Sequence, residues 1–170
     1  LGQAMSFDGS DDYVSTSLTN LNFSGGSVSW WQKPSTAHNS GAARAIWGQL
    51  AVSGEDEGGL TCEILGSNNW SCGWFSTFGD RRVTLAASAS NYPQNEWNYY
   101  TLVWNSSGTT LYMNGSSIAT NGSSPQISIF DWAEAFELGR LSGFSNTYFP
   151  GSIDDFRIYT RALSISEIKQ

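Results

Sequence analysis

An all-β domain, built as a sandwich or a barrel, is the fold that the sequence predicts. Nearly every segment alternates apolar and polar residues with a period of two, and almost none shows the 3.6-residue period of a helix. Turn residues interrupt these segments at short intervals, as is typical of a protein made of many short strands. The chain has 170 residues, which suits a single domain over residues 1–170 with one hydrophobic core.

The predicted strands follow one another along the chain, with turns rich in Asn, Ser and Gly between them. We expect strands over residues 3–7, 12–15, 26–33, 43–50, 59–64, 71–75, 83–87, 98–104, 109–113, 116–120, 136–141 and 151–160. The pair Asn114-Gly115 predicts a two-residue hairpin, because both positions must accept a positive φ. Near the C-terminal end, Ser164 and Glu167 have the spacing of a capping box and predict one short helix.

Alternation along a strand also sorts the aromatic residues. Trp30 shares a face with Val28, whereas Trp31 shares the opposite face with Lys33, so the two tryptophans cannot enter the same core layer. In residues 97–104 both faces carry apolar or aromatic groups. We therefore expect that strand to be covered on both faces, or to form an aromatic-lined concavity on one of them.

Composition and charge argue against two classes of partner. The 15 acidic residues outnumber the 8 Lys and Arg residues, and the formal net charge is −7. Binding to nucleic-acid phosphates is therefore not expected. No apolar run approaches the roughly 18 residues of a membrane helix, so no membrane insertion is expected. The start at Leu1 does not resemble a signal peptide. Since the polar residues are mostly small and uncharged, we expect a mature piece of a secreted or cell-surface protein.

Cys62 and Cys72 flank a turn cluster at residues 66–69 that can reverse the chain and bring the two thiols together. We expect a disulfide across this hairpin, with a stabilisation of about 2–3 kcal/mol, in an oxidising compartment. The alternative is a pair of buried free thiols. Two cysteines with His38 as the one histidine do not make a Cys-rich zinc site.

Three stretches of the chain together resemble one protein family. They are AMSFDGSDDYV at residues 4–14, VSWWQKP at 28–34, and GSIDDFRIYTRALS at 151–164, which is followed by Glu167-Ile168. In this order they resemble the concanavalin A-like, laminin-G-like jelly-roll domains of secreted bacterial proteins. The resemblance implies a two-sheet antiparallel jelly-roll sandwich with the first and last strands side by side.

The resemblance also implies a calcium site, because relatives often hold a structural Ca²⁺ ion near the junction of these strands. Asp8 and Asp154, or Asp155 in place of Asp154, would supply carboxylate oxygens, and residues 24–26 would supply main-chain oxygens. The alternative is that Asp8 is a turn former that bonds its own backbone, while Asp154 is a charge on an edge strand.

A glycan-binding surface is the second candidate site. Sugars offer apolar C–H faces and many hydroxyls, so flat aromatic rings beside short polar and amide side chains are suited to bind them. The ligand contacts that we expect are Asn68, Asn69, Trp70 and Trp74 of one turn-rich segment, together with Trp47, Arg81 and Trp132. For each tryptophan, core packing is the alternative.

Catalysis is not expected. Hydrolases of this class carry two glutamates and an aspartate on one strand face, because retaining hydrolysis needs paired carboxylates, and the sequence lacks their spacing. The acidic run at 55–57 lies among glycines and indicates a solvated loop. His38 falls in a polar stretch, so it does not indicate the base of a lyase.

These observations predict a non-catalytic, lectin-like carbohydrate-binding module of an extracellular multidomain protein, with a polysaccharide or glycan as its partner. The alternative is an adhesion or protein-interaction module whose exposed aromatic rings meet a protein surface. A polysaccharide hydrolase or lyase is the third hypothesis, and the missing acid pattern argues against it.

Overall fold

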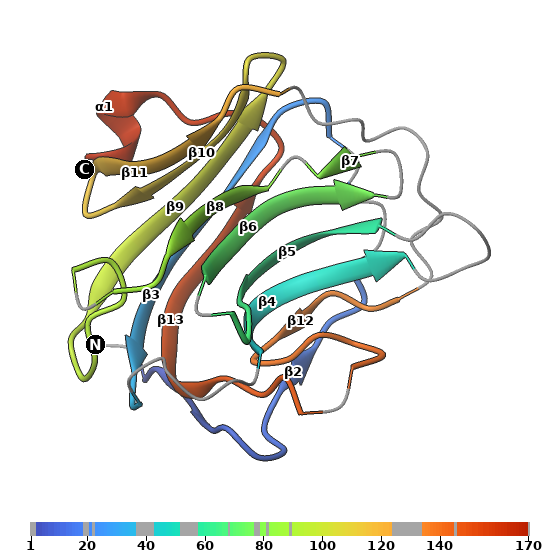
Figure 1. Cartoon of the computed structure of the whole chain (residues 1–170), viewed down its shortest axis with the longest axis vertical. Coiled ribbons are helices and arrows are strands. Elements are labelled where there is room, and N and C mark those ends of the chain that lie inside the picture. The colour runs from blue at the N-terminus through green and yellow to red at the C-terminus, as the bar shows by residue number, and fades with distance from the viewer. Residues whose placement is uncertain are drawn as a thin grey trace.

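Two antiparallel sheets face each other in the computed structural model, with a short helix near the C-terminal end (Figure 1). The structure describes residues 3–18, 21, 23–36, 43–51, 58–67, 69–76, 79–80, 82–88, 90–123, 134–144 and 146–169. This architecture confirms the predicted two-sheet jelly-roll sandwich. Within these ranges, no helix has the length and apolar character needed to cross a membrane.

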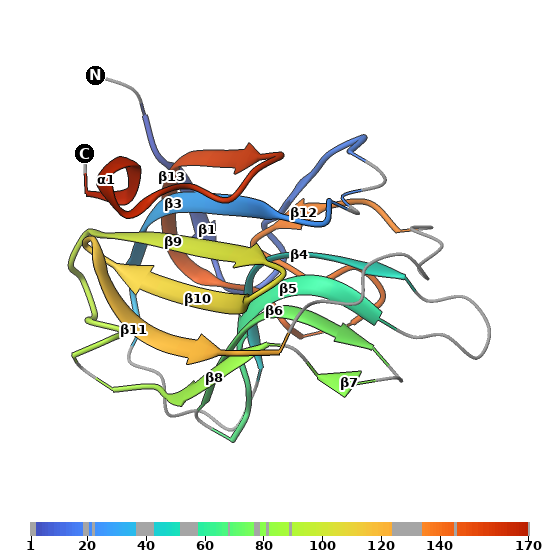
Figure 2. The same cartoon turned by 90° about the horizontal axis from the view of Figure 1, so that it is seen from above.

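The six-stranded sheet has the order β1-β13-β3-β9-β10-β11, and the second sheet has the order β2-β12-β4-β5-β6-β7, with β8 paired to β6. The strands are β1 (Met5–Asp8), β2 (Val14–Ser15), β3 (Gly26–Pro34), β4 (Arg44–Ala51), β5 (Gly58–Ile64), β6 (Asn69–Ser76), β7 (Gly79–Asp80), β8 (Val83–Ala86), β9 (Asn98–Asn105), β10 (Gly108–Met113), β11 (Ser116–Asn121), β12 (Glu137–Leu138) and β13 (Pro150–Tyr159). Figure 2 shows the two sheets as separate layers. Each predicted strand corresponds to an observed one, and the two-residue β7 was not predicted.

The beginning and the end of the chain meet in the six-stranded sheet. Strand β1 runs antiparallel to β13, with Phe7 opposite Gly151, and β13 in turn pairs with β3. This confirms the expected neighbourhood of the first and last strands. Strand β1 therefore forms the edge of the sheet, and β13 lies inside it.

Aromatic side chains fill the space between the sheets. The Trp30 ring stacks on Tyr100 at 5.6 Å between centroids and meets Trp47 edge-on at 5.4 Å. Its indole N–H donates to Gln32 Oε1 at 2.7 Å, so the buried donor has a partner. The largest fully buried aromatic side chains are Trp30, Trp47, Trp70, Trp74, Trp104, Tyr100, Phe136 and Phe149.

Cys62 on β5 and Cys72 on β6 lie opposite each other and form a disulfide, as the sequence predicted. Both are buried in the core, and a turn at Gly66 and Ser67 connects the two strands. The part of the chain that the structure describes contains no free cysteine. A disulfide is typical of a protein from an oxidising compartment.

The predicted hairpin turn between β10 and β11 is also confirmed. Asn114 has φ of 49° and Gly115 has φ of 77°, so both occupy the left-handed region that a two-residue turn of this kind requires. The Asn114 side chain holds the turn against the neighbouring strand, because its Oδ1 accepts from the Tyr99 amide at 2.9 Å.

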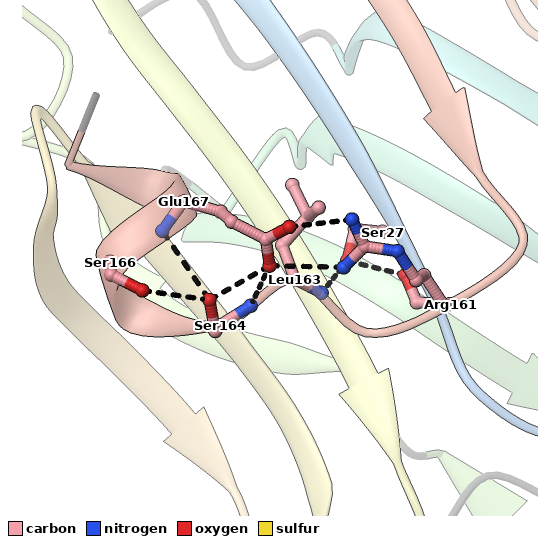
Figure 3. A network of polar contacts seen from close by, with 6 residues as sticks. All are labelled: Ser27, Arg161, Leu163, Ser164, Ser166 and Glu167. Carbon is pink, nitrogen blue, oxygen red and sulfur yellow. Dashed lines mark hydrogen bonds and ion pairs between the residues drawn. The ribbon is translucent and has the colours of Figure 1, made fainter.

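The C-terminal segment is held to the six-stranded sheet by a polar network around helix α1 (Ile165–Ile168), shown in Figure 3. The predicted capping box is present: Ser164 Oγ accepts from the Glu167 amide, and Glu167 accepts from the Ser164 amide. Arg161 donates to Glu167 at 2.9 Å. Ser27 of β3 joins the network, since its Oγ accepts from the Leu163 amide at 2.9 Å and donates to the Arg161 carbonyl oxygen.

We expect this network to weaken in acid. Hydrogen bonds from Arg161 and Ser164 lower the pKa of Glu167 from 4.5 to about 2. A carboxylate with a lowered folded-state pKa stabilises the fold above its unfolded pKa and loses that contribution as the pH falls. The difference in Tm between the wild type and Glu167→Gln should therefore be largest at neutral pH and shrink between pH 4.5 and pH 2. Glu96→Gln is the control, and a Tm difference that stays constant over this range would contradict the assignment.

Candidate functional site

The tryptophans predicted to contact a ligand lie in the core instead. Trp47, Trp70 and Trp74 are fully buried between the sheets. Trp70 meets Tyr92 edge-on at 5.5 Å, and Trp74 meets Trp104 at 5.7 Å. The prediction was wrong for these three rings. Strand β6 covers residues 69–76, so it begins two residues before the predicted strand at 71–75, and its alternation turns Trp70 and Trp74 toward the core.

Asn69, the polar member of the predicted set that the structure describes, is half-buried at the start of β6. Its Nδ2 donates to Ser67 Oγ at 3.4 Å, so the amide takes part in the local turn. Strand alternation places it on the opposite face from Trp70. The predicted residues outside the described ranges are Asn68, Arg81 and Trp132, together with His38 and the acidic run at 55–57.

The structure does not bring Asp8 and Asp154 together, so the predicted calcium pair is wrong. Asp8 lies opposite Pro150, and Asp154 follows four residues later on β13, which is more than about 10 Å along an extended strand. Asp8 Oδ1 accepts from the Ser10 amide at 2.7 Å, and Asp154 Oδ1 accepts from the Asp155 amide at 2.8 Å. These carboxylates do not fit a shared Ca²⁺ ion. No cluster of three metal-ligating side chains occurs among the described residues.

The outer face of the second sheet is closed over strand β4. Gly48 leaves room there for the side chain of Leu141, and a Cβ at Gly48 would collide with it. Leu141 packs with Ala45 and Leu50 in a small second apolar cluster that Phe75 borders. Among the described residues, this face therefore presents packed apolar groups at β4.

Two buried glutamates on the same face are paired with arginines. Glu63 of β5 accepts from Arg82 at 3.0 Å. Glu137 of β12 binds Arg140 through two bonds of 2.7 and 3.0 Å, which raise the pKa of Arg140 above its usual range. The Arg140 guanidinium also lies 3.5 Å from the centroid of the Tyr13 ring. Each of these carboxylates is therefore bonded to a guanidinium.

The outer face of the six-stranded sheet has a buried half and an open half. Its outward-facing pairs along the β3–β9 ladder are Ser27–Val103, Ser29–Thr101 and Trp31–Tyr99. The first two pairs are buried, and the C-terminal segment is bonded to Ser27 at that end. Trp31 is 37% exposed, so the face opens at the third pair.

Trp31 and Tyr99 form a two-ring platform in this open half. Their ring centroids are 5.4 Å apart, with 43° between the planes. Together with Asp155 and Arg157 of β13, they line an open hollow of about 190 Å³. Arg157 donates to Asp155 Oδ1 at 3.3 Å. Its contacts with Tyr159 and then Asp155 raise the pKa of Arg157 above its usual range, so the guanidinium stays charged.

A β-bulge in β13 directs the charged residues of this hollow. The register with β3 breaks between Asp154 and Arg157, and Asp155 has φ of 47°. At the bulge, the Asp154 carboxylate accepts a hydrogen bond from the Asp155 amide. Bulges commonly re-aim side chains beside functional sites, and this one is next to the platform.

A second open hollow of about 190 Å³ lies on the same face. Lys33 and Trp97 line it. Lys33 lies two residues after Trp31 on β3, and Trp97 lies two residues before Tyr99, just before β9 begins. Ser6 of β1, Ser152 of β13 and Asn95 contribute hydroxyl and amide groups. Trp97 is 41% exposed, so this hollow too presents an accessible aromatic ring.

The sequence pattern placed Trp31 on the opposite strand face from Trp30, and Tyr99 on the opposite face from Tyr100, but it did not identify Trp31 and Tyr99 as a site. Each faces outward by simple alternation, and an aromatic-lined concavity was one of the two outcomes expected for residues 97–104. The missing information was that β3 and β9 are neighbours, because only then do the two rings meet. An outward-facing aromatic residue in each of two well-marked strands was the available signal.

The sequence of this chain matches a known protein family. Residues 8–169 match the family model described as the concanavalin A-like lectin/glucanases superfamily. The chain belongs to this superfamily. No curated protein sequence matches it significantly.

Solved structures agree with the superfamily's lectin-like fold. A SAP-like pentraxin from Limulus polyphemus has a TM-score of 0.63 and 16% identity over 96% of this chain and 78% of its own. Domain 4 of AbnA, an extracellular arabinanase from Geobacillus stearothermophilus solved with arabinotriose, has a TM-score of 0.63 and 21% identity over 99% and 76%. The binding domain of Paraclostridial Mosquitocidal Protein 1 has a TM-score of 0.67 and 19% identity over 98% and 42%. At these identities the likeness shows the fold alone.

Proposed function

We propose that this chain is a non-catalytic carbohydrate-binding domain that holds its ligand on the outer face of the six-stranded sheet. The observation that carries the proposal is the exposed Trp31–Tyr99 platform, with Arg157 and Asp155 at its side. A sugar ring can stack an apolar C–H face on such rings while its hydroxyls bond to the guanidinium and the carboxylate. Membership in a lectin-like superfamily supports the same class of ligand.

The state of the buried acids supports binding without cleavage. Retaining glycoside hydrolysis uses two carboxyl groups about 5 Å apart, one of which must carry a proton. Glu63 and Glu137 are each bonded to an arginine, and Asp155, which lines the platform hollow, is paired with Arg157. Each of these carboxylates is therefore bonded to a guanidinium, and the proposal assigns none of them to cleavage.

An extracellular setting fits this proposal. The Cys62–Cys72 disulfide is typical of secreted proteins. The arabinanase domain that resembles this chain belongs to an extracellular enzyme, and this chain spans 42% of the mosquitocidal protein chain. We therefore propose a secreted module that brings a larger protein to its glycan.

Retention of the purified chain in affinity gels containing neutral or anionic polysaccharides tests the proposal. We expect retardation by at least one neutral polysaccharide, without release of reducing ends during prolonged incubation. Reducing-end release that follows the pure protein would show an enzyme. Absence of retardation in every gel, combined with capture of a protein partner that free sugars do not displace, would favour the protein-interaction alternative.

A further inference from the structure

We infer that the hollow at Trp97 is a second sugar subsite, so that the ligand is an extended, uncharged oligosaccharide lying along the β3–β9 ladder. This inference rests on the proposed function. The ligand would run along β3 and β9, contain at least two sugars and carry no charge. Four features of the molecule support it: the spacing of the two hollows, the buried residues at one end of the face, the anchored turn before Trp97, and the balance of charge at the hollows.

The spacing of the two hollows suits consecutive sugars. Lys33 follows Trp31 by two residues on β3, and Trp97 precedes Tyr99 by two residues. At a rise of about 3.4 Å per residue, the second pair lies about 7 Å from the first along the strands. That separation is comparable to one sugar ring with its linkage. A ligand stacked on Trp31 therefore reaches Trp97 with its next unit.

Among the described residues, the sheet surface along β3 and β9 is accessible to a ligand from the first hollow only toward Trp97. Beyond the first hollow on the other side, Ser29 and Thr101 are fully buried, and the C-terminal segment is bonded to Ser27. A chain that stacks on Trp31 cannot continue over these residues on the sheet surface. It can extend toward Trp97, where the second hollow continues the face.

The segment that carries Trp97 is anchored to its neighbours before any ligand arrives. The Asn95 amide donates to the Pro34 carbonyl oxygen at 2.8 Å, and Gln94 Nε2 donates to the Ser35 carbonyl oxygen at 2.8 Å. Asn95 also has φ of 60°, a turn conformation that asparagine tolerates. Holding this turn in place reduces the ordering cost of binding at Trp97.

The charges around the two hollows favour an uncharged ligand. Among the charged residues that line the two hollows, Lys33 and Arg157 bring positive charge and Asp155 brings negative charge, and Asp154 lies opposite Trp31 on the neighbouring strand. The balance does not provide the positive field that recognition of uronate or sulfate groups requires, and the whole chain carries −7. The remaining groups at the second hollow, Ser6, Asn95 and Ser152 among them, are neutral donors and acceptors suited to sugar hydroxyls.

Isothermal titration with a length series tests the inference. The probes are cello-, xylo-, manno- and arabino-oligosaccharides, from monosaccharide to hexasaccharide, and the sulfated or uronate form of the series that binds. We expect affinity to rise between monosaccharide and trisaccharide in the wild type, and the charged form to bind more weakly. Trp97→Ala should remove most of that rise, and Trp97→Phe should restore part of it.

Two results would overturn the inference, and they differ from failure of the proposed function. If the wild type binds neutral sugars and Trp97→Ala keeps the full length dependence, the second subsite is wrong and the proposed function stands. If the charged oligosaccharides bind more tightly, the ligand class is wrong. If no sugar of any length binds the wild type, the proposed function fails as well. Far-ultraviolet circular dichroism and Tm establish that both variants are folded.

Discussion

Replacing Trp31 with alanine is expected to weaken glycan binding by at least about tenfold without unfolding the domain. Its ring is exposed and forms half of the platform, so its removal takes away the stacking surface but leaves the core intact. Loss of about 1.4 kcal/mol, the order of one aromatic stack, corresponds to that factor. Titration with the polysaccharide that retards the wild type, beside a melting curve, measures both effects.

Phe144→Ala provides a matched control for this variant. Phe144 is a large aromatic residue that is 54% exposed, and it follows β12 rather than lying on the six-stranded sheet. Its removal should leave binding unchanged. If Phe144→Ala weakens binding as much as Trp31→Ala does, or if Trp31→Ala binds normally, the platform is not the site.

Replacing the preceding residue, Trp30, is expected to damage the fold. Trp30 is fully buried against Tyr100 and Trp47, and its indole N–H is bonded to Gln32. Truncation of a buried tryptophan to alanine costs about 3–5 kcal/mol. At about 2–4 °C per kcal/mol for a domain of this size, Tm should fall by roughly 10 °C.

The two adjacent tryptophans thus make a paired experiment. Trp30→Ala should lower the free energy of unfolding strongly, whereas Trp31→Ala should change it by less than about 1 kcal/mol, as is usual for exposed positions. Denaturant unfolding of both variants gives these values directly. Equal destabilisation by the two substitutions would contradict the strand assignment that separates their faces.

Local patterns were sufficient to predict the all-β class and the main strands, whereas the two-sheet arrangement was implied by the family resemblance. Alternation in residues 26–33 separated Trp30 from Trp31, and Asn114-Gly115 and Ser164 marked the hairpin and the helix start that the structure contains. These features depend on residues close together in sequence, whose geometry is set by backbone preferences and side-chain periodicity. The resemblance at the two ends correctly paired the first and last strands.

The position of the candidate site depends on contacts that no local pattern encodes. Trp31 and Tyr99 are far apart in sequence and meet only because β3 and β9 are neighbours in the sheet. Trp70 was expected in a turn-rich segment just before a strand, because Asn and Ser surround it. Its strand instead pairs with β5 on one side and β8 on the other, so the small polar residues face outward and the rings face inward.

Register explains the failure of the predicted calcium pair. The family pattern places the strands that carry Asp8 and Asp154 next to each other, and they are neighbours. Adjacent strands bring two residues together only when the register matches, and here Asp8 faces Pro150. Gly9, with φ of 83°, then turns the chain at the end of β1.

Indole ¹⁵N–¹H spectra recorded during titration with a neutral oligosaccharide test the central claim most directly, because each of the eight tryptophans gives its own signal. If the ligand lies on the outer face of the six-stranded sheet, the Trp31 and Trp97 signals should shift first and most, while those of the buried Trp30, Trp47, Trp70, Trp74 and Trp104 stay in place. Shifts at Trp47, Trp70, Trp74 or Trp132 with an unchanged Trp31 signal would contradict it.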